Sequence, residues 1–292
     1  MALAAPTLSE TTRNLSIHAT LAVYWHLLSL DAPTVAAVWS WSFARAAHID
    51  LPRFAPLLLA VGTWLVYVTD RILDGLDRAN QEYLRERHHF YSEHRKAFLA
   101  ANAVVCPIFL WIVFTRMSPA ARLEDSAVFA VAALYFLLVH THGHGVERWL
   151  PKELAVGTLF AAATAVPTWS RIAGHRLALV PVVALFALLC WLNCVAIEVW
   201  EGTAATRAGA HSTTVWVGRH LQELAAGTAL LSIALAATHF RADALFCLYL
   251  ASAMAALLLL WLARTSNFTA IQLRVAVDAV LLTPLLFTAW MR

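Results

Sequence analysis

The stretch FAPLLLAVGTWLVYVTDRILDGLD (residues 54–77) decides the fold class of this chain, because an apolar helix there ends in a run of acids. The part from Phe54 to Thr69 carries no charge, and Asp70, Asp74 and Asp77 follow it. Carboxylates four and three residues apart lie on one face of a helix. Ionisable groups next to a membrane span are costly, so these three acids are candidates for a functional role.

The composition of the whole chain agrees with this membrane assignment. Of 292 residues, 61% are hydrophobic and 13% are charged, and the mean hydropathy is +0.66. A soluble domain carries about 25% charged residues. The net charge is only +3 and is spread over an apolar chain. We therefore expect a helical membrane protein that spans the bilayer several times, with membrane lipid as its surroundings and no nucleic-acid partner.

The number of spans follows from the length of the apolar segments. A helix needs about 20 apolar residues to cross about 30 Å of hydrocarbon. On this scale the sequence predicts nine spans, at residues 32–47, 54–73, 97–116, 126–142, 153–170, 177–197, 221–240, 243–263 and 275–291. Polar groups near one end of such a bundle cannot face lipid. The expected fold is thus an all-α polytopic membrane protein, one membrane domain over residues 1–292, with nine transmembrane helices around a central cavity.

Basic residues predict the orientation of these spans. The N-terminal segment and the loops after spans 2, 4, 6 and 8 hold the larger share of the chain's 21 Lys and Arg residues. Loops rich in Lys and Arg stay in the cytoplasm. We expect an integral protein of the cell (inner) membrane with a cytoplasmic N-terminus. The long polar loop at about residues 74–96 then lies on the cytoplasmic side.

A second apolar segment also ends in acids on the predicted cytoplasmic side. In NCVAIEVWEG, Glu198 and Glu201 share a helical face with Cys194. Two helices that each end in a carboxylate face can build one acidic pocket. Solvated helix ends with Asp–Arg pairs, or hydrogen bonds between helices, would also account for these acids.

Converging carboxylates repel one another unless a cation lies between them, and the sequence therefore predicts Mg²⁺ with a phosphate-bearing substrate. The expected metal ligands are Asp70, Asp74, Asp77, Glu198 and Glu201. Lys152, Arg71 and Arg78 are the cations expected to surround the phosphate groups.

Histidines gather in two further segments. HTHGHG contains His140, His142 and His144, and RHHFYSEHRK contains His88, His89 and His94. Ligation of a metal by the first group is possible, whereas hydrogen bonding at the membrane interface is the simpler explanation. The second group is typical of a short basic amphipathic helix at the headgroup surface.

Four segments, in this order, resemble a known family. LLSLDAPTVAAVWSW (residues 27–41) is similar to the pattern LxRxDKPxG, and VYVTDRILD (residues 66–74) is similar to NDxxDRxxD. EGTAATRAGAHSTTVWVG (residues 201–218) is similar to DxxxDDxxxGxKST, and LPKELAVGTLF contains a basic residue, Lys152, before the fifth span. Together these segments resemble the UbiA-type intramembrane prenyltransferases.

The resemblance implies a reaction and its participants. Members of this family have nine helices and condense an isoprenyl diphosphate with a lipophilic acceptor, using Mg²⁺ held by Asp-rich motifs on the second and sixth helices. The catalytic residues implied here are Asp70, Asp74 and Glu201, with Lys152, Arg71 and Arg78 binding the diphosphate. The loop at about residues 74–96 is implied to cap the active site.

The chain departs from the family pattern at several motif positions, which hold Ser29, Ala32, Val66, Tyr67, Ala205 and His211. Because some motif acids and cations are absent, two alternatives stay open beside the prenyltransferase. One is an intramembrane terpene cyclase of the same superfamily, in which the substrate chain attacks itself. The other is a non-catalytic protein that binds a lipid or a quinone.

Overall fold

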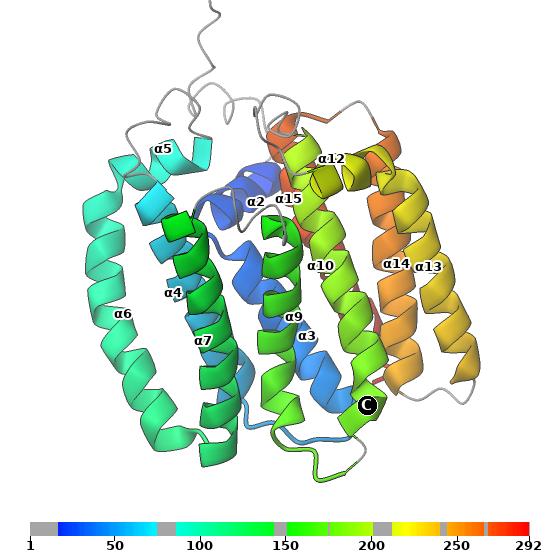
Figure 1. Ribbon diagram of the computed structural model, residues 1–292, viewed down its shortest axis with the longest axis horizontal. Helices are drawn as coiled ribbons and strands as arrows, with labels where there is room; N and C mark the ends of the chain where they lie inside the picture. The colour runs from blue at the N-terminus through cyan, green and yellow to red at the C-terminus, as the bar shows by residue number, and fades with distance from the viewer. Residues whose placement is uncertain are drawn as a thin grey trace, which may run out of the picture.

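The computed structural model describes residues 17–74, 86–142, 151–174, 176–200, 212–239, 244–265 and 268–291. In these residues all regular secondary structure is helical, and the long helices stand side by side in one bundle (Figure 1). The first half of the chain supplies α2 (Ile17–Leu27), α3 (Asp31–Ala46), α4 (Phe54–Asp74), α5 (Glu86–Glu93), α6 (Arg95–Arg116) and α7 (Pro119–His142). The second half supplies α9 (Lys152–Trp169), η2 (Arg176–Leu179), α10 (Val180–Trp200), α12 (Ser212–Arg219), α13 (Leu221–Thr238), α14 (Ala244–Arg264), α15 (Ala270–Val280) and η3 (Thr283–Phe287).

Five of the described helices are long and apolar enough to cross a membrane: α4, α6, η2 with α10, α13 and α14. A sixth crossing is formed if the bent pair α2 and α3 counts as one span. The expected class of all-helical membrane protein is therefore confirmed, while the number nine stays a prediction. The last predicted span, residues 275–291, is not one long α-helix. Within it α15 ends at Val280, after 11 residues or about 17 Å of helix, and the chain continues as the short 3₁₀ helix η3.

A sharp corner separates α2 from α3. The two helices meet at 89°, and Ser29 between them has a left-handed backbone, with φ of 54°. The Leu30 amide donates to the Trp25 carbonyl at 3.0 Å, and the Ser29 amide donates to the His26 carbonyl at 2.9 Å. This pair of bonds is the Schellman motif, in which the left-handed position is usually glycine. Serine at this position brings a hydroxyl group into the corner.

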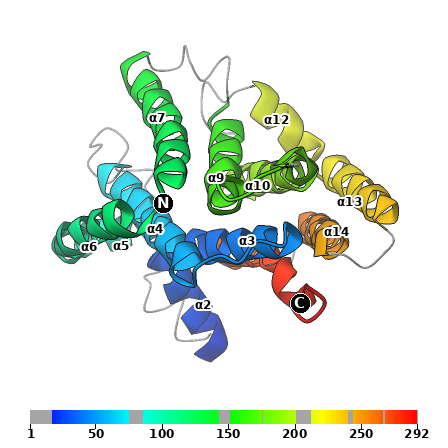
Figure 2. The ribbon, with the colours of Figure 1, turned by 90° about the horizontal axis from the view of Figure 1, so that it is seen from below.

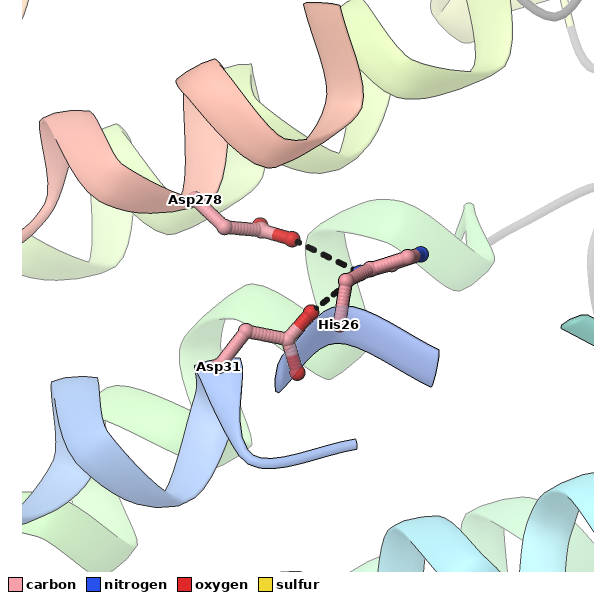
Figure 3. A group of neighbouring side chains, drawn as sticks. All are labelled: His26, Asp31 and Asp278. Atoms are coloured by element: carbon pink, nitrogen blue, oxygen red, sulfur yellow. Dashed lines mark hydrogen bonds and ion pairs between the residues drawn. The ribbon is translucent and has the colours of Figure 1, made fainter. Parts of the chain in front are cut away.

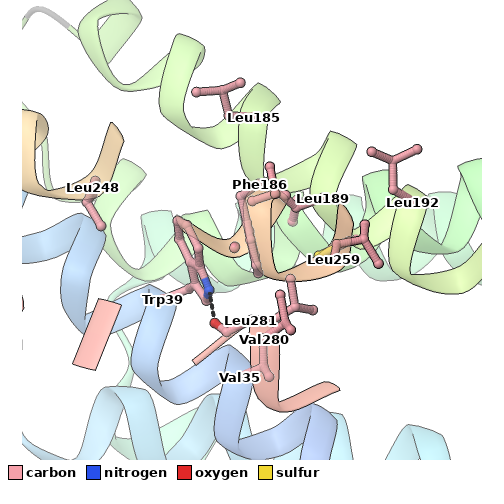
Figure 4. Packing of buried hydrophobic residues seen from close by; sticks show 14 of the residues in the cluster. Val35, Trp39, Leu185, Phe186, Leu189, Leu192, Leu248, Leu259, Val280 and Leu281 are labelled. Atoms are coloured by element: carbon pink, nitrogen blue, oxygen red, sulfur yellow. Dashed lines mark hydrogen bonds between the residues drawn. The ribbon is translucent and has the colours of Figure 1, made fainter. Parts of the chain in front are cut away.

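The main hydrophobic core lies between α3, α10 and α14. Trp39 of α3 stacks on Phe186 of α10 with ring centroids 4.2 Å apart, and both side chains are fully buried (Figure 4). Small residues of α14, among them Ala251, Ala255 and Ala256, have no exposed surface. Small residues let neighbouring helix backbones approach closely, which is how helices without water between them gain packing energy.

Side chains of this core also hold the end of α15. The Trp39 indole donates to the Leu281 carbonyl at 2.7 Å, and the Asn193 amide donates to the Val277 carbonyl at 2.8 Å. Carbonyls at the end of a helix have no partner within that helix. Here α3 and α10 supply the missing donors, so the position of α15 is fixed against both helices.

Candidate functional site

A narrow cavity of about 40 Å³ lies where α3, α4, α9, α10 and α15 meet. Its polar wall consists of Tyr67, Asn193, Cys194 and Asp278, and the remaining wall is mostly apolar. One water molecule needs roughly 10–15 Å³ measured in this way. The cavity therefore admits water-sized groups and leaves no room for a long hydrocarbon chain.

The acids predicted from the sequence follow the cavity wall along two helices. Residues three or four apart lie on one helical face, so Asp70 and Asp74 continue the face of α4 that carries Tyr67. In the same way Glu198 continues the face of α10 that carries Cys194. Both helices run toward the same end of the bundle (Figure 1). The half-buried Asp70 and Glu198 thus stand about one turn beyond the cavity.

The start of α9 brings further charges to the same end. Lys152 is the exposed first residue of α9, and Glu153 follows it in the first turn. The Thr214 hydroxyl of α12 donates to Glu153 Oε2 at 2.9 Å. Lys152, Glu153 and Glu198 all lie within electrostatic range of Cys194. This end of the bundle therefore combines carboxylates with an ammonium group.

Arg71 binds the corner between α2 and α3. Its Nε donates to Ser29 Oγ at 2.9 Å, and the Tyr91 hydroxyl donates to the same oxygen at 3.1 Å. The Arg71 guanidinium also lies over the Tyr67 ring, 5.8 Å from its centroid. Burial raises the pKa of the Tyr91 phenol, so the hydroxyl keeps the proton that it donates.

The described part of the loop predicted to cap the site, α5, packs against α4 and α6. The short helix expected around RHHFYSEHRK is α5, and Tyr91 on it stacks on Phe98 of α6 at 4.0 Å. Both rings pack with Val68 and Ile72 of α4 in a small separate core. Residues 86–93 are therefore held against the end of α4 that carries Asp70.

Several predicted site positions lie outside the described residues, namely Asp77, Arg78, His144 and Glu201. The structure describes the backbone but not the side chains of Asp74, His88, His89, His140 and His142. Among the predicted histidines His94 is described, and its Nδ1 lies 3.0 Å from the Phe90 carbonyl of the preceding turn. The metal and catalytic roles of the predicted residues stay predictions.

A cluster that was not predicted lies beside the cavity (Figure 3). His26 Nδ1 is 2.6 Å from Asp31 Oδ2 and 3.8 Å from Asp278 Oδ2. His26 comes from the last turn of α2, Asp31 from the first turn of α3, and Asp278 from α15. Asp278 also lines the cavity. The three residues bring an imidazole and two carboxylates together.

One of these residues had a signal in the sequence. Asp278 is a lone acid inside the predicted span at residues 275–291, and such residues are functional candidates by default. Asp31 was noted only as part of the family-like segment at residues 27–41. His26 had no signal, because its contact with Asp31 depends on the bend between α2 and α3 and its contact with Asp278 on the packing of α15.

Comparisons with protein-family models, with curated proteins and with solved structures find no match for this chain.

Proposed function

We propose that this protein is a UbiA-like intramembrane enzyme that transfers a prenyl group from an isoprenyl diphosphate to a lipophilic acceptor, with Mg²⁺ as cofactor. One observation carries the proposal: the acid-bearing faces of α4 and α10 continue the two walls of one cavity toward the same end of the bundle. Carboxylates placed in this way suit Mg²⁺, which binds one or two carboxylates together with substrate phosphates.

The chemistry requires charge neutralisation at this end. A departing diphosphate leaves about three negative charges, and Mg²⁺ with nearby cations stabilises them as the bond breaks. Asp70, Asp74 and Glu201 are the proposed Mg²⁺ ligands, and Lys152 with Arg78 the proposed diphosphate contacts. Because the Nε of Arg71 is bonded to Ser29, we assign Arg71 to holding the end of α4 in place.

The hydrocarbon part of the substrate needs a second, apolar site. A groove of about 460 Å³ along α9 and α10 is lined by residues such as Leu154, Trp169, Leu188 and Trp191. This volume falls within the usual range for small-molecule sites, about 300–1,000 Å³. From Leu154 to Trp169 the groove follows about 22 Å of helix, and it begins two residues from Lys152. A prenyl chain in this groove therefore has its diphosphate end near the charged end of α9.

The proposed orientation places the charged end on the cytoplasmic side. Arg95 and Lys96 begin α6 and Arg264 ends α14 at the end of the bundle that carries Lys152, while Arg45, Arg116 and Arg176 lie at opposite helix ends. Over the whole sequence, the predicted cytoplasmic side holds the larger share of the 21 Lys and Arg residues. Basic residues at helix ends favour the cytoplasmic face. We propose the cell (inner) membrane with a cytoplasmic N-terminus, where water-soluble prenyl diphosphates have access to the site.

The test measures consumption of labelled prenyl diphosphate by the purified protein in lipid nanodiscs, with Mg²⁺ or with excess chelator. Asp74→Ala and Glu201→Ala should each lower consumption at least about 100-fold, as expected for lost transition-state charge stabilisation. Asp77→Ala and Lys152→Ala should lower it less. Glu223→Ala is the matched control, because Glu223 is an exposed acid at the start of α13.

Three outcomes separate the alternatives. Consumption that depends on an added lipid extract as acceptor supports prenyl transfer. Diphosphate release without any acceptor supports the cyclase instead. A wild-type protein that consumes no substrate from C10 to C20 and longer, with Mg²⁺ present, overturns both enzymatic assignments and favours a lipid- or quinone-binding protein.

A further inference from the structure

The cluster of His26, Asp31 and Asp278 is built from three segments that the proposed Mg²⁺ site does not use (Figure 3). One imidazole nitrogen and one oxygen from each carboxylate all lie within 4.8 Å of one another. The His26 side chain is 4% exposed, and those of Asp31 and Asp278 are 11% and 19% exposed. Such convergence of nitrogen and oxygen donors away from bulk water is typical of a metal site.

We infer that His26, Asp31 and Asp278 bind a divalent transition-metal ion such as Zn²⁺, Mn²⁺ or Fe²⁺. Imidazole nitrogen suits transition metals, whereas Mg²⁺ prefers oxygen ligands alone. Donor atoms about 2.1 Å from a tetrahedral ion lie roughly 3.4 Å apart. The two distances from His26 Nδ1, 2.6 Å and 3.8 Å, lie on either side of that value. Side-chain shifts of less than about 1 Å would therefore complete the coordination.

The ligands are held in position by contacts around them. Asp31 Oδ1 accepts the Ala32 amide at 2.9 Å, which fixes one oxygen and leaves Oδ2 toward His26. Asp278 is placed by α15, whose end is tied to α10 through Asn193 and to α3 through Trp39. Partners of this kind orient metal ligands and raise affinity about 10–100-fold.

The cavity provides a place for a further ligand. Asp278 belongs both to the cluster and to the wall of the 40 Å³ cavity. This space exceeds the roughly 10–15 Å³ that one water needs. A metal bound by three protein ligands keeps an open position for water, as catalytic metal sites do. The cavity therefore supports an accessible metal site rather than a closed structural one.

Nearby arginines set the charge balance of the site. Arg71 and Arg274 lie within electrostatic range of His26. These cations lie close to the two acids, and the hydrogen bond between His26 Nδ1 and Asp31 Oδ2 holds the cluster together without an ion. Adding a divalent ion leaves the site positive, and an anionic ligand such as hydroxide on the cavity side would offset that charge. Metal binding should consequently strengthen as the pH rises.

The experiment uses the full-length protein in nanodiscs, purified with a tag that contains no histidine. After chelator treatment, the protein is titrated with Co²⁺, followed by its visible absorption, and with Zn²⁺, counted by elemental analysis. We expect one ion per chain, resistant to excess Mg²⁺. His26→Gln and Asp278→Asn should each weaken binding by at least about 100-fold, more than loss of an orienting partner. His94→Gln is the control, because the His94 ring, among the described contacts, hydrogen-bonds only the Phe90 carbonyl in the preceding turn.

A second variant tests whether the other histidine group, His140, His142 and His144, binds the ion instead. Replacing His140, His142 and His144 together by Ala should leave binding unchanged. If the ion is lost in that variant, or is retained in His26→Gln, the inference is overturned. A wild-type protein that binds no ion also overturns it and leaves a hydrogen-bonded network of His26 and Asp31. Where His26→Gln fails to fold, Asp31→Asn and the triple variant decide the question, with folding checked by gel filtration and circular dichroism.

Discussion

Two helices of the bundle, α6 and α14, differ in burial although the sequence makes them look alike. The most apolar 18-residue segment of each helix has the same mean hydropathy, 2.3. Within that segment 6% of the residues are buried in α6 and 56% are buried in α14. Figure 2 shows α6 at one edge of the bundle, whereas α14 lies between α13 and α3. Hydropathy therefore identifies a helix that tolerates lipid, and it does not reveal which helices pack against protein.

The kind of apolar residue separates the two helices better. Along its buried stretch α14 has alanine and serine, including Ala251, Ser252 and Ala256. Between Val104 and Phe114, α6 carries large side chains that are exposed on the bundle surface. Small residues allow close helix contact, and large apolar residues suit lipid. The contrast thus yields predictions that compare matched substitutions on the two sides.

The largest expected effect is removal of a ring from the core. Phe186→Ala should lower the free energy of unfolding by about 3–5 kcal/mol, because a buried aromatic leaves a cavity. Phe114→Ala on α6, where the ring is 66% exposed, should change it by less than about 1 kcal/mol. Unfolding in mixed micelles with increasing denaturant measures both. If both variants lost the same free energy of unfolding, α6 would have to be covered by another protein surface. The contrast between a buried α14 and an exposed α6 would then be wrong.

A smaller effect should follow from adding volume. Ala256→Leu places a branched side chain where the structure leaves no space, and overpacking costs about 1–3 kcal/mol. Ala103→Leu on the exposed face of α6 should be neutral within about 0.5 kcal/mol. The same unfolding assay applies. A neutral Ala256→Leu would show that the helices around α14 give way easily, contrary to the full burial of Ala256 in the core.

The sparsely packed side also carries a half-buried acid, Asp125, near the start of α7. Burial, with the neighbouring Glu124, raises the pKa of Asp125 to about 6. Because the folded state then binds a proton that the unfolded state has lost, stability should fall as the pH rises from about 4 to 6. Asp125→Asn should remove this dependence and stabilise the protein at pH 7 by about 1–2 kcal/mol. Melting temperatures from pH 4 to 7 test this, and an unchanged pH profile in the variant contradicts it.

Sequence reasoning found the helices because length and hydropathy are local properties. The segment predicted at residues 54–73 is α4 (Phe54–Asp74), and the one predicted at 97–116 lies within α6 (Arg95–Arg116). The bend after α2 was missed, since glycine usually marks a left-handed residue and Ser29 occupies the position. Breaks of this kind depend on tertiary contacts, here those of the Ser29 hydroxyl with Arg71 and Tyr91.

The candidate site was accessible to sequence reasoning only along single helices. Spacing alone identified the acid-bearing face of α4 from Asp70 onward and that of α10 up to Glu198. Which helices bring their faces together depends on packing that no local pattern records. His26 and Asp278 illustrate this limit, because the first and last α-helices of the described residues, α2 and α15, must meet before the two residues become neighbours.

The contact between the two ends of the chain also has a consequence for synthesis. Trp39 bonds a carbonyl 242 residues later, and Arg45 bonds the Met291 carbonyl 246 residues later. A chain that leaves the ribosome N-terminus first holds α3 in the membrane while these partners do not yet exist. The side chains of α3 that bond these carbonyls therefore lack those partners, in the bilayer or at its interface, until the end of the chain is inserted. Quality control by membrane proteases therefore has a long interval in which to recognise a chain that stops short of α15.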